Sequence, residues 1–365
     1  MKKGLDRRQF VVGGAAAGAA ALFGLAGCSS GGGADGGNEP KEGADGASQD
    51  VAKPEKIIFA WEPSNSTTEY ENMREVFGEA IAEGAGVPCE ILTTTDFNVT
   101  IESLSSGKAH MASLGASEYV EIHKKNPAVE VAFVLSDKEG KLNQVSYHSQ
   151  VLCREEDVDQ YKRADGTFSI DDIKGKDYAF VSLSSTSGFV IPATIFVSKF
   201  GMKNTDDFAE SGGFFSTVTM AGSQVLSVYT LVNGDADLCS CDDTSASAAY
   251  NVVSGENGEV GTVYEIKEGL DGELANHAGK RLVCVESYPV PAVPFCVNTD
   301  FVPEDMRKDI VDYMCSSAVS DNPELFKDPS DKETVTKWKK TSDKVSFVPA
   351  DDSYYDDFRQ LIGEV

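Results

Sequence analysis

The fold is decided by residues 178–181 (YAFV) and residues 184–200 (SSTSGFVIPATIFVSKF). The first run is short, apolar and rich in strand-forming residues. Beyond Gly188 the apolar residues recur at helical spacing, at Phe189, Ile195, Phe196 and Phe200. The two runs therefore predict a strand, a hydroxyl-rich turn and a helix.

The turn carries four hydroxyl residues in a row, Ser184–Ser187, which is more than a helix cap requires. Free N–H groups and the positive end of the helix dipole make such a turn a seat for an anion. Ser185, Thr186 and Ser187 add O–H donors, and Gly188 would let a ligand approach the backbone. The alternative is an over-capped helix that binds nothing. Pro192 lies beyond the first helical position, so it removes one helix bond or marks a kink.

Strands and helices alternate on both sides of this turn, which predicts mainly parallel sheets covered by helices. The expected strands are residues 57–60, 87–92, 111–114, 129–135, 217–220, 236–239, 281–285 and 295–298. The expected helices are residues 70–81, 97–106, 118–125, 224–233, 244–251, 304–317 and 354–362. Residues 254–280 are rich in Gly and Glu, and we expect them to be irregular.

Residues 101–114 and 226–239 repeat one pattern of helix, polar turn and strand, which favours two similar lobes. In open α/β sheets ligands bind at the carboxyl ends of the strands. Two facing lobes would bring together in one cleft Phe97, Ser117, Ser185–Gly188, Ser223, Asp242 and Asp243. Each of these residues alone would be read as an ordinary helix cap or turn residue. The prediction of one shared site rests on their common position at the carboxyl ends of the strands.

The first 28 residues are expected to be an export signal. Arg7-Arg8-Gln9-Phe10 is typical of a twin-arginine signal, and Leu25–Cys28 (LAGC) matches a lipobox with Cys28 as the lipidated residue. The alternative is a plain transmembrane anchor. Residues 29–54 are rich in Gly, Ala, Ser, Asp and Glu, which predicts a flexible tether. The protein would then be exported and attached by lipid to the outer face of the cytoplasmic membrane.

The formal net charge is −27, and removing residues 1–27, which carry a net +3, leaves −30. This charge argues against a nucleic-acid partner. Of eight cysteines, seven remain beside Cys28; they are small buried residues or form one or two disulfides, and Cys239 and Cys241 would share one face of a strand. With no CxxC pair and no Cys/His cluster, we expect neither a metal nor a cofactor.

The chain resembles the phosphate, phosphite and phosphonate-binding proteins of ABC importers. The matching pieces span residues 57–298. They are Asp96-Phe97 with Ile101–Leu104, Gly107–Ala109, Leu114-Gly115, Lys174–Lys176, Ala179–Val181, Ser184–Phe189 with Pro192, Ala221–Ser223, Gly234–Asp237, Pro291 and Pro294-Phe295. The Ser-Thr-Ser-Gly-Phe turn is the most specific piece.

This resemblance implies a two-lobed type II periplasmic-binding-protein fold that closes on its ligand, with residues 55–148 and 290–365 in lobe I and residues 149–289 in lobe II. It implies that Ser185, Thr186 and Ser187 hold a phosphorus oxyanion (phosphonate, phosphite or phosphate), and that an ABC permease and ATPase are the partners of a monomer. Phe97 lacks the usual hydroxyl, Ser223 replaces a common His, and Thr244 and Val293 are not acidic.

The sequence leaves two other functions open. An accessory lipoprotein that senses the anion for a signalling partner, or a binding protein for another small anion or a thiamine-related ligand, would share the fold. An enzyme is not expected, because the chain has no G-x-S-x-G elbow, no HExxH and no P-loop, and its four His are scattered.

Overall fold

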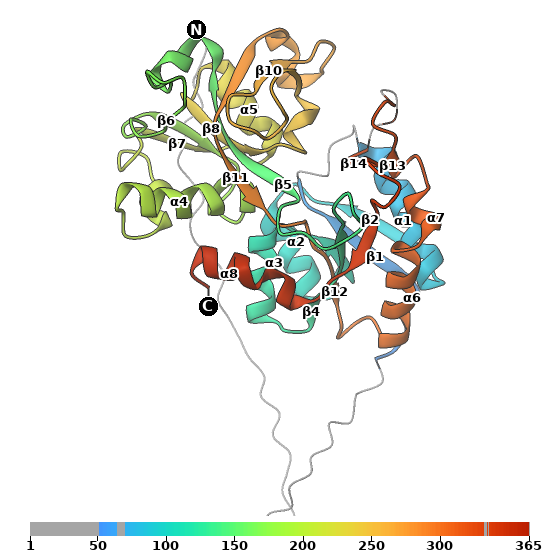
Figure 1. Cartoon of the computed structure of the whole chain (residues 1–365). Coiled ribbons are helices and arrows are strands. Elements are labelled where there is room, and N and C mark those ends of the chain that lie inside the picture. The colour runs from blue at the N-terminus through green and yellow to red at the C-terminus, as the bar shows by residue number, and fades with distance from the viewer. Residues whose placement is uncertain (1–50, 64–69, 332–333, 335, 365) are drawn as a thin grey trace, which may run out of the picture. The chain divides into compact units, whose positions relative to one another are not determined.

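The computed structural model describes residues 51–63, 70–331, 334 and 336–364 (Figure 1). The predicted export signal, the lipidation residue Cys28 and the tether lie outside the described residues, apart from residues 51–54. Within the described ranges, no helix is both long enough and apolar enough to cross a membrane.

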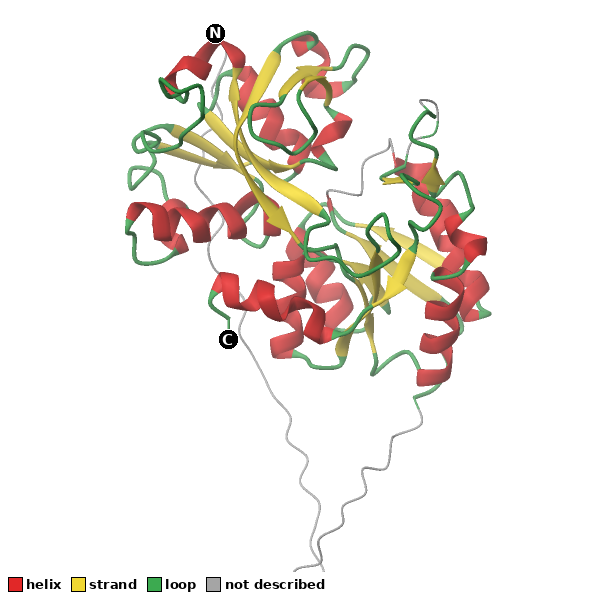
Figure 2. Cartoon of the chain, in the orientation of Figure 1, coloured by secondary structure: helices red, strands yellow, loops and turns green. Residues whose placement is uncertain are grey.

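The first lobe is built on a six-stranded sheet with the order β15-β4-β12-β3-β1-β2. Its strands are β1 (Ile57–Trp61), β2 (Cys89–Thr93), β3 (Met111–Ser113), β4 (Val129–Leu135), β12 (Phe295–Asn298) and β15 (Phe347–Pro349). Helices flank this sheet (Figure 2). They are α1 (Glu71–Ala85), α2 (Phe97–Ser105), α3 (Ala116–Lys125), α6 (Glu304–Met314), α7 (Ser317–Ser320) and α8 (Asp356–Ile362).

An aromatic cluster forms the core of the first lobe. The ring of Phe77 on α1 lies 5.2 Å from the ring of Phe295 and 5.1 Å from that of Phe59. Phe133 stacks on Phe295 at 4.8 Å. Strands buried on both faces read as continuous apolar runs, which explains why β1 is IIFAW without alternation.

The second lobe is built on a seven-stranded sheet with the order β7-β6-β8-β5-β11-β10-β9. Its strands are β5 (Tyr147–Arg154), β6 (Asp177–Phe180), β7 (Thr217–Met220), β8 (Leu238–Asp242), β9 (Tyr250–Ser254), β10 (Val263–Ile266) and β11 (Arg281–Val290). Its longer helices are α4 (Ile191–Phe200) and α5 (Gln224–Asn233), and a π-helical turn η4 (Thr186–Val190) precedes α4. Short 3-10 turns are η3 (Glu155–Gln160), η5 (Thr205–Phe208), η6 (Ala246–Ala248), η7 (Gly272–His277) and, near the carboxyl terminus, η8 (Asp352–Tyr355).

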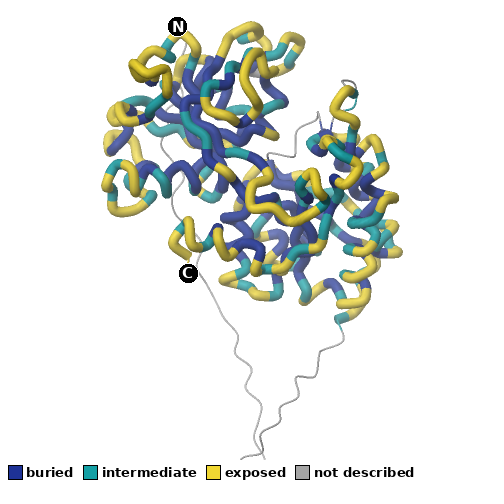
Figure 3. Tube along the Cα trace, viewed as in Figure 1, coloured by how far each residue is buried: buried dark blue, intermediate teal, exposed yellow. Residues whose placement is uncertain are grey.

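The chain passes between the two sheets along β5 and β11, which pair antiparallel side by side (Figure 1). Their register ends at Val290 opposite Tyr147, and Ser146 donates its N–H to the carbonyl of Val290 at 2.9 Å. Buried residues follow the strands of both sheets, whereas most exposed residues lie in loops and on outer helix faces (Figure 3).

The two-lobed α/β architecture is confirmed, but both sheets are mixed rather than mainly parallel. Only β1–β2 and β1–β3 in the first sheet, and β6–β7 and β6–β8 in the second, pair in parallel. The chain passes between the lobes twice. On its return to the first lobe, strand β12 inserts between β3 and β4 and pairs antiparallel with both, which makes that sheet mixed.

Two local predictions are wrong. The helix expected at residues 244–251 is only the turn η6 followed by β9, and the irregular region 254–280 contains β10. The β-branched pair Val252 and Val253 favours a strand, and β9 is paired with β10. The tail also contains a two-stranded parallel sheet, β13 (Phe326–Lys327) with β14 (Trp338–Lys339), which the pattern did not predict.

Candidate functional site

The hydroxyl turn joins β6 to α4 as predicted, through a π-helical turn. Ser185 is its N-cap, and the Ser185 side chain accepts the N–H of Gly188 at 3.2 Å. The carbonyl of Ser185 accepts from Val190, five residues on, at 3.0 Å. Because α4 starts only at Ile191, Pro192 falls in its first turn, where a missing N–H costs little. Single π turns occur frequently at functional sites.

Gly188 is required for packing inside this turn. A Cβ at Gly188 would lie 2.3 Å from Cγ2 of Val181, which is far closer than a real contact. Gly188 therefore lets the turn fold back on the end of β6, and the predicted contact of its backbone with a ligand stays a prediction.

A cavity of about 30 Å³ lies in front of the turn. Among the predicted site residues it is lined by Phe97, Ser185, Thr186, Ser187 and Asp242. Its other lining residues are Glu62, Gly115, Glu118, Tyr147, Gln224, Thr244, Ser245, Val293 and Lys337. Ser117, Gly188, Ser223 and Asp243 do not line it.

Ser117 joins the two lobes just beside the cavity. Its N–H donates to Oγ1 of Thr186 at 2.9 Å, and its hydroxyl donates to the carbonyl of Ser184 at 2.8 Å. The two hydroxyl oxygens of Ser117 and Thr186 are 2.8 Å apart. Since the single proton of Ser117 is directed to Ser184, Thr186 must be the donor in that contact. The hydroxyl of Thr186 therefore both accepts a hydrogen bond from Ser117 and donates one to it.

The glycine at the start of α3 allows this close contact. A Cβ at Gly115 would lie 2.6 Å from Oγ1 of Thr186. Two helix N-termini, those of α3 and of η4, therefore meet at the cavity, and their first N–H groups have no intrahelical acceptor.

Gln224, the first residue of α5, orders the remaining hydroxyls. Its Nε2 donates to Oγ of Ser187 at 3.3 Å and to Oγ of Ser185 at 3.5 Å, while its Oε1 accepts from the N–H of Asp242 at 2.9 Å. Both serines accept these bonds, and among the described residues neither hydroxyl proton has an acceptor. Ser185 and Ser187 are therefore the side-chain donors that remain for a ligand.

The neighbouring Ser223 has a different place. It is the N-cap of α5, and its Oγ accepts the N–H of Leu226 at 3.2 Å. The sequence pattern identified the helix start correctly, but the residue that lines the cavity is the next one, Gln224.

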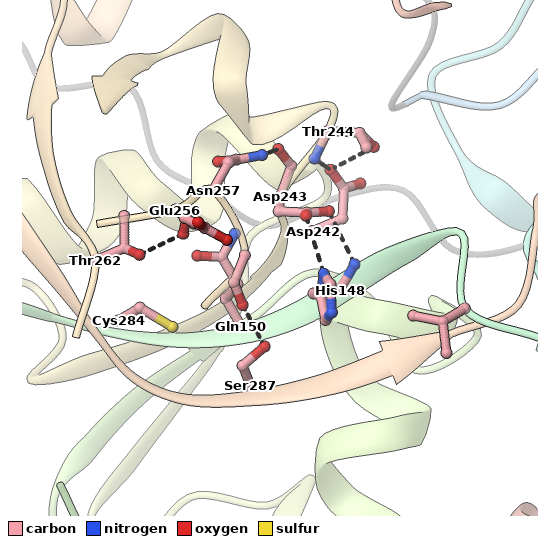
Figure 4. Close-up of polar contacts among 12 residues, drawn as sticks. His148, Gln150, Asp242, Asp243, Thr244, Glu256, Asn257, Thr262, Cys284 and Ser287 are labelled. Carbon is pink, nitrogen blue, oxygen red and sulfur yellow. Dashed lines mark hydrogen bonds and ion pairs between the residues drawn. The ribbon is translucent and has the colours of Figure 1, made fainter. Parts of the chain in front are cut away.

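Asp242 and Asp243 point in different directions (Figure 4). Oδ1 of Asp242 accepts from the N–H and hydroxyl of Thr244, at 2.9 and 3.1 Å, and thereby caps the turn that follows. Asp243 accepts from the N–H of His148 at 2.9 Å and lies 3.3 Å from its Nδ1, which raises the pKa of His148. Asp242 thus lines the cavity, whereas Asp243 bonds to His148 and does not line it.

Two buried glutamates, which the sequence analysis missed, also line the cavity. Glu62 is 7% exposed and Glu118 is 1% exposed. Oε2 of Glu118 accepts the N–H of Gly115, and Glu62 lies close enough to raise the pKa of Glu118. Two neighbouring buried carboxylates repel each other, so we infer that the pair carries at least one proton.

Burial is the main reason that the pKa values of both carboxyl groups are raised. It raises the pKa of Glu62 to about 7, against the opposing effect of Lys337. It raises the pKa of Glu118 well above the usual range, and the charge of Glu62 raises it further. Lys337 donates to Oγ of Ser245 at 2.7 Å, and burial lowers its pKa. The cavity therefore combines hydroxyl donors, one lysine and a proton-sharing carboxyl pair.

No signal in the sequence distinguished Glu62 and Lys337, which lie in irregular segments. Glu118 stands at the third position of α3, the usual place for a Glu that bonds back to the residue before the helix. Within the described ranges, no group of three or more His, Cys, Asp and Glu side chains is placed to hold a metal ion. The seven cysteines of the described part are free thiols. Cys239 and Cys241 are two residues apart on β8 and therefore lie on the same face of the strand, as expected.

Comparisons with known proteins point to one family. The family model described as ABC transporter, phosphonate, periplasmic substrate-binding protein matches residues 59–355. The phosphate-import protein PhnD of Mycolicibacterium smegmatis is 23% identical over 192 residues, which are 52% of this chain and 56% of that protein. The match thus covers little more than half the length of that relative.

Two solved structures share the fold. The binding protein component of an ABC phosphonate transporter from Pseudomonas aeruginosa superimposes with a TM-score of 0.57 at 14% identity, covering 84% of this chain and 85% of that one. PhnD1 from Prochlorococcus marinus, in complex with methylphosphonate, gives 0.58 at 11% identity, covering 85% and 99%.

Proposed function

The chain belongs to the phosphonate periplasmic substrate-binding family of ABC transporters, and we propose that it binds a phosphorus oxyanion (phosphonate, phosphite or phosphate) in the cavity at the hydroxyl turn. The family consists of extracytoplasmic transport binding proteins and not of enzymes. The ligand would be delivered to a membrane permease that is driven by an ATPase.

The observation that carries this proposal is the set of donors around the cavity. Ser185 and Ser187 line the cavity, and among the described residues no acceptor is found for their hydroxyl protons. Hydrogen bonds to a charged group contribute roughly 1.5–3 kcal/mol each. Three or four of them are on the scale of the ~8 kcal/mol that corresponds to micromolar affinity.

The carboxyl pair explains how an anion is tolerated beside three acidic residues. Glu62 and Glu118 share a proton, and Oδ1 of Asp242 is occupied by the N–H groups that follow it. Lys337 supplies a positive charge at the same cavity. Beyond the oxyanion, a ligand meets Phe97 and Val293, which favours a small, apolar substituent on phosphorus.

Several finer features belong to the same proposal. Export by the twin-arginine signal, lipid attachment at Cys28 and a flexible tether would hold a monomer at the outer face of the cytoplasmic membrane. Lobe I would comprise residues 55–148 and 290–365 and lobe II residues 149–289, with closure about β5 and β11. The composition supports the absence of a nucleic-acid partner.

The test is isothermal titration of the full chain, purified in phosphate-free buffer, with phosphate, phosphite, methylphosphonate, 2-aminoethylphosphonate and sulfate. We expect one or more phosphorus compounds to bind. Thermal unfolding gives a second readout, because ligand at about a hundred times its Kd adds roughly 2.7 kcal/mol and raises Tm by several degrees.

Ser187→Ala should lose at least tenfold in affinity because it removes a donor aimed at the ligand. Ser182→Ala is the matched control, since Ser182 lies in the same turn but does not line the cavity. Folded, ligand-free protein that responds to none of the phosphorus compounds would overturn the proposed function.

A further inference from the structure

A second cavity, of about 80 Å³, adjoins the oxyanion cavity and is mainly apolar. Four of its lining residues, Tyr147, Thr244, Val293 and Lys337, also line the first cavity. The others are Trp61, Ser113, Leu135, Ser146, Phe295 and Trp338. A molecule whose oxyanion lies at the hydroxyl turn would therefore direct its remaining atoms toward this second cavity.

One row of the first sheet forms a wall of the second cavity. Trp61 on β1 and Phe295 on β12 both pair in register with Ser113 on β3, so the three side chains project from the same face. The rings of Trp61 and Phe295 are 6.1 Å apart, and Trp338 lies 6.0 Å from Phe295. Aromatic and aliphatic surfaces of this kind favour an apolar ligand group.

Ser113 is the exception within this row. Its side chain is fully buried, and among the described residues its Oγ has no hydrogen-bond partner. A buried hydroxyl without a partner is unfavourable, so its presence at a cavity wall points to a group that occupies the cavity and bonds to it.

We propose that the second cavity holds the organic substituent of the ligand, so that the preferred ligands are phosphonates with a short aliphatic chain that carries one hydrogen-bonding oxygen. The apolar walls take the carbons, and Ser113 takes the oxygen. This inference rests on the proposed function, because it assumes that the phosphorus oxyanion lies at Ser185 and Ser187.

The volume limits the length of the chain. An apolar protein cavity of about 150 Å³ admits benzene. The second cavity has about half that volume, so it suits two to four carbons and excludes a phenyl ring. The site thereby differs from one that recognises phosphate or phosphite alone.

The experiment measures the Kd of the full chain for methyl-, ethyl-, propyl-, butyl- and phenylphosphonate by titration calorimetry. Affinity should rise by about fourfold for each added methylene, the equivalent of ~0.8 kcal/mol, until the cavity is full. Phenylphosphonate should show no gain over methylphosphonate. Methylphosphonate itself reports only on the oxyanion site.

Two variants locate the effect. Leu135 lines the second cavity but not the first, so Leu135→Phe should abolish the gain with chain length and leave methylphosphonate binding unchanged. Ser113→Ala should weaken 2-hydroxyethyl- and 3-hydroxypropylphosphonate by about tenfold while leaving ethyl- and propylphosphonate unaffected, because it removes only the hydrogen bond.

The outcomes separate the two proposals. Binding of methylphosphonate with no dependence on chain length, or a gain that persists in Leu135→Phe, would overturn this inference and leave the proposed function standing. Failure of every phosphonate to bind would overturn both.

Discussion

Replacing Glu118 by Gln tests whether the cavity contains a proton-sharing carboxyl pair. Gln keeps the shape of the side chain, and its Oε1 can still accept the N–H of Gly115. Its amide can donate to Glu62 without any proton being held between two carboxyl groups. Burial, the main cause of the raised pKa of Glu62, is unchanged in Glu118→Gln. We therefore expect the variant to remove only the pH dependence of folding that Glu118 itself imposes.

The sign follows from the raised pKa values. In the unfolded chain Glu118 has a pKa near 4.5, whereas burial and the charge of Glu62 raise its pKa well above that value in the folded protein. Between these values the folded state holds a proton that the unfolded state has lost. The stabilisation is therefore complete below about pH 4.5 and is lost as the pH rises through the raised pKa of Glu118.

The magnitude follows from the slope. A proton that only the folded state holds changes the free energy of unfolding by about 1.4 kcal/mol per pH unit. Glu118 is buried, so solvent does not screen this effect. Glu62 titrates in both proteins, so the wild type should lose free energy of unfolding relative to Glu118→Gln by ~1.4 kcal/mol per pH unit, from about pH 4.5 up to the raised pKa of Glu118.

The assay is urea unfolding of both proteins at half-unit steps from pH 4.5 to 8. The many other carboxylates of this acidic chain titrate alike in both proteins, so their effect cancels in the difference. Glu121→Gln is the matched control, because Glu121 lies on the same helix but is exposed and paired with Lys125. Parallel curves for wild type and Glu118→Gln would refute the raised pKa of Glu118.

Three further predictions follow from single contacts. Gly188→Ala should reduce the free energy of unfolding by about 1–3 kcal/mol in urea, because its Cβ would overlap Val181. Val181→Ala should not restore the loss, because Cβ of residue 181 would still lie 2.4 Å from the added Cβ. Asp243→Asn should lower the pKa of His148, measured by NMR titration of the imidazole, because it removes the carboxylate that favours the charged ring. Reductant should leave Tm unchanged, since the seven cysteines of the described part are free; a fall in Tm would reveal a disulfide.

The strand-turn-helix unit at residues 178–200 could be predicted because its local patterns agree with its tertiary setting. The strand-forming run, the hydroxyl N-cap and the apolar helix face all favour the same structure. The boundaries of α5 were predicted correctly for the same reason, with Ser223 before the helix and Gly234 after it.

The mixed sheets could not be predicted, because strand direction depends on how the chain returns between lobes. Nothing in the sequence of β12 shows that it inserts between β3 and β4. The residues that complete the cavity are hidden for a related reason. Glu62, Gln224 and Lys337 are far apart in the chain, and only folding brings them to one surface.

The hydroxyl turn divides its donors between closure and ligand binding. Thr186 bonds to Ser117 in both directions, and this contact exists only while the two lobes touch. Ser185 and Ser187 keep their protons for a ligand. Under the proposed function, a ligand that binds the closed arrangement better shifts the protein toward it, and the Thr186 bonds then add to affinity without contacting the ligand. Loss of Thr186 would thus weaken every ligand by one common factor, whereas loss of a cavity donor would change the preference among oxyanions.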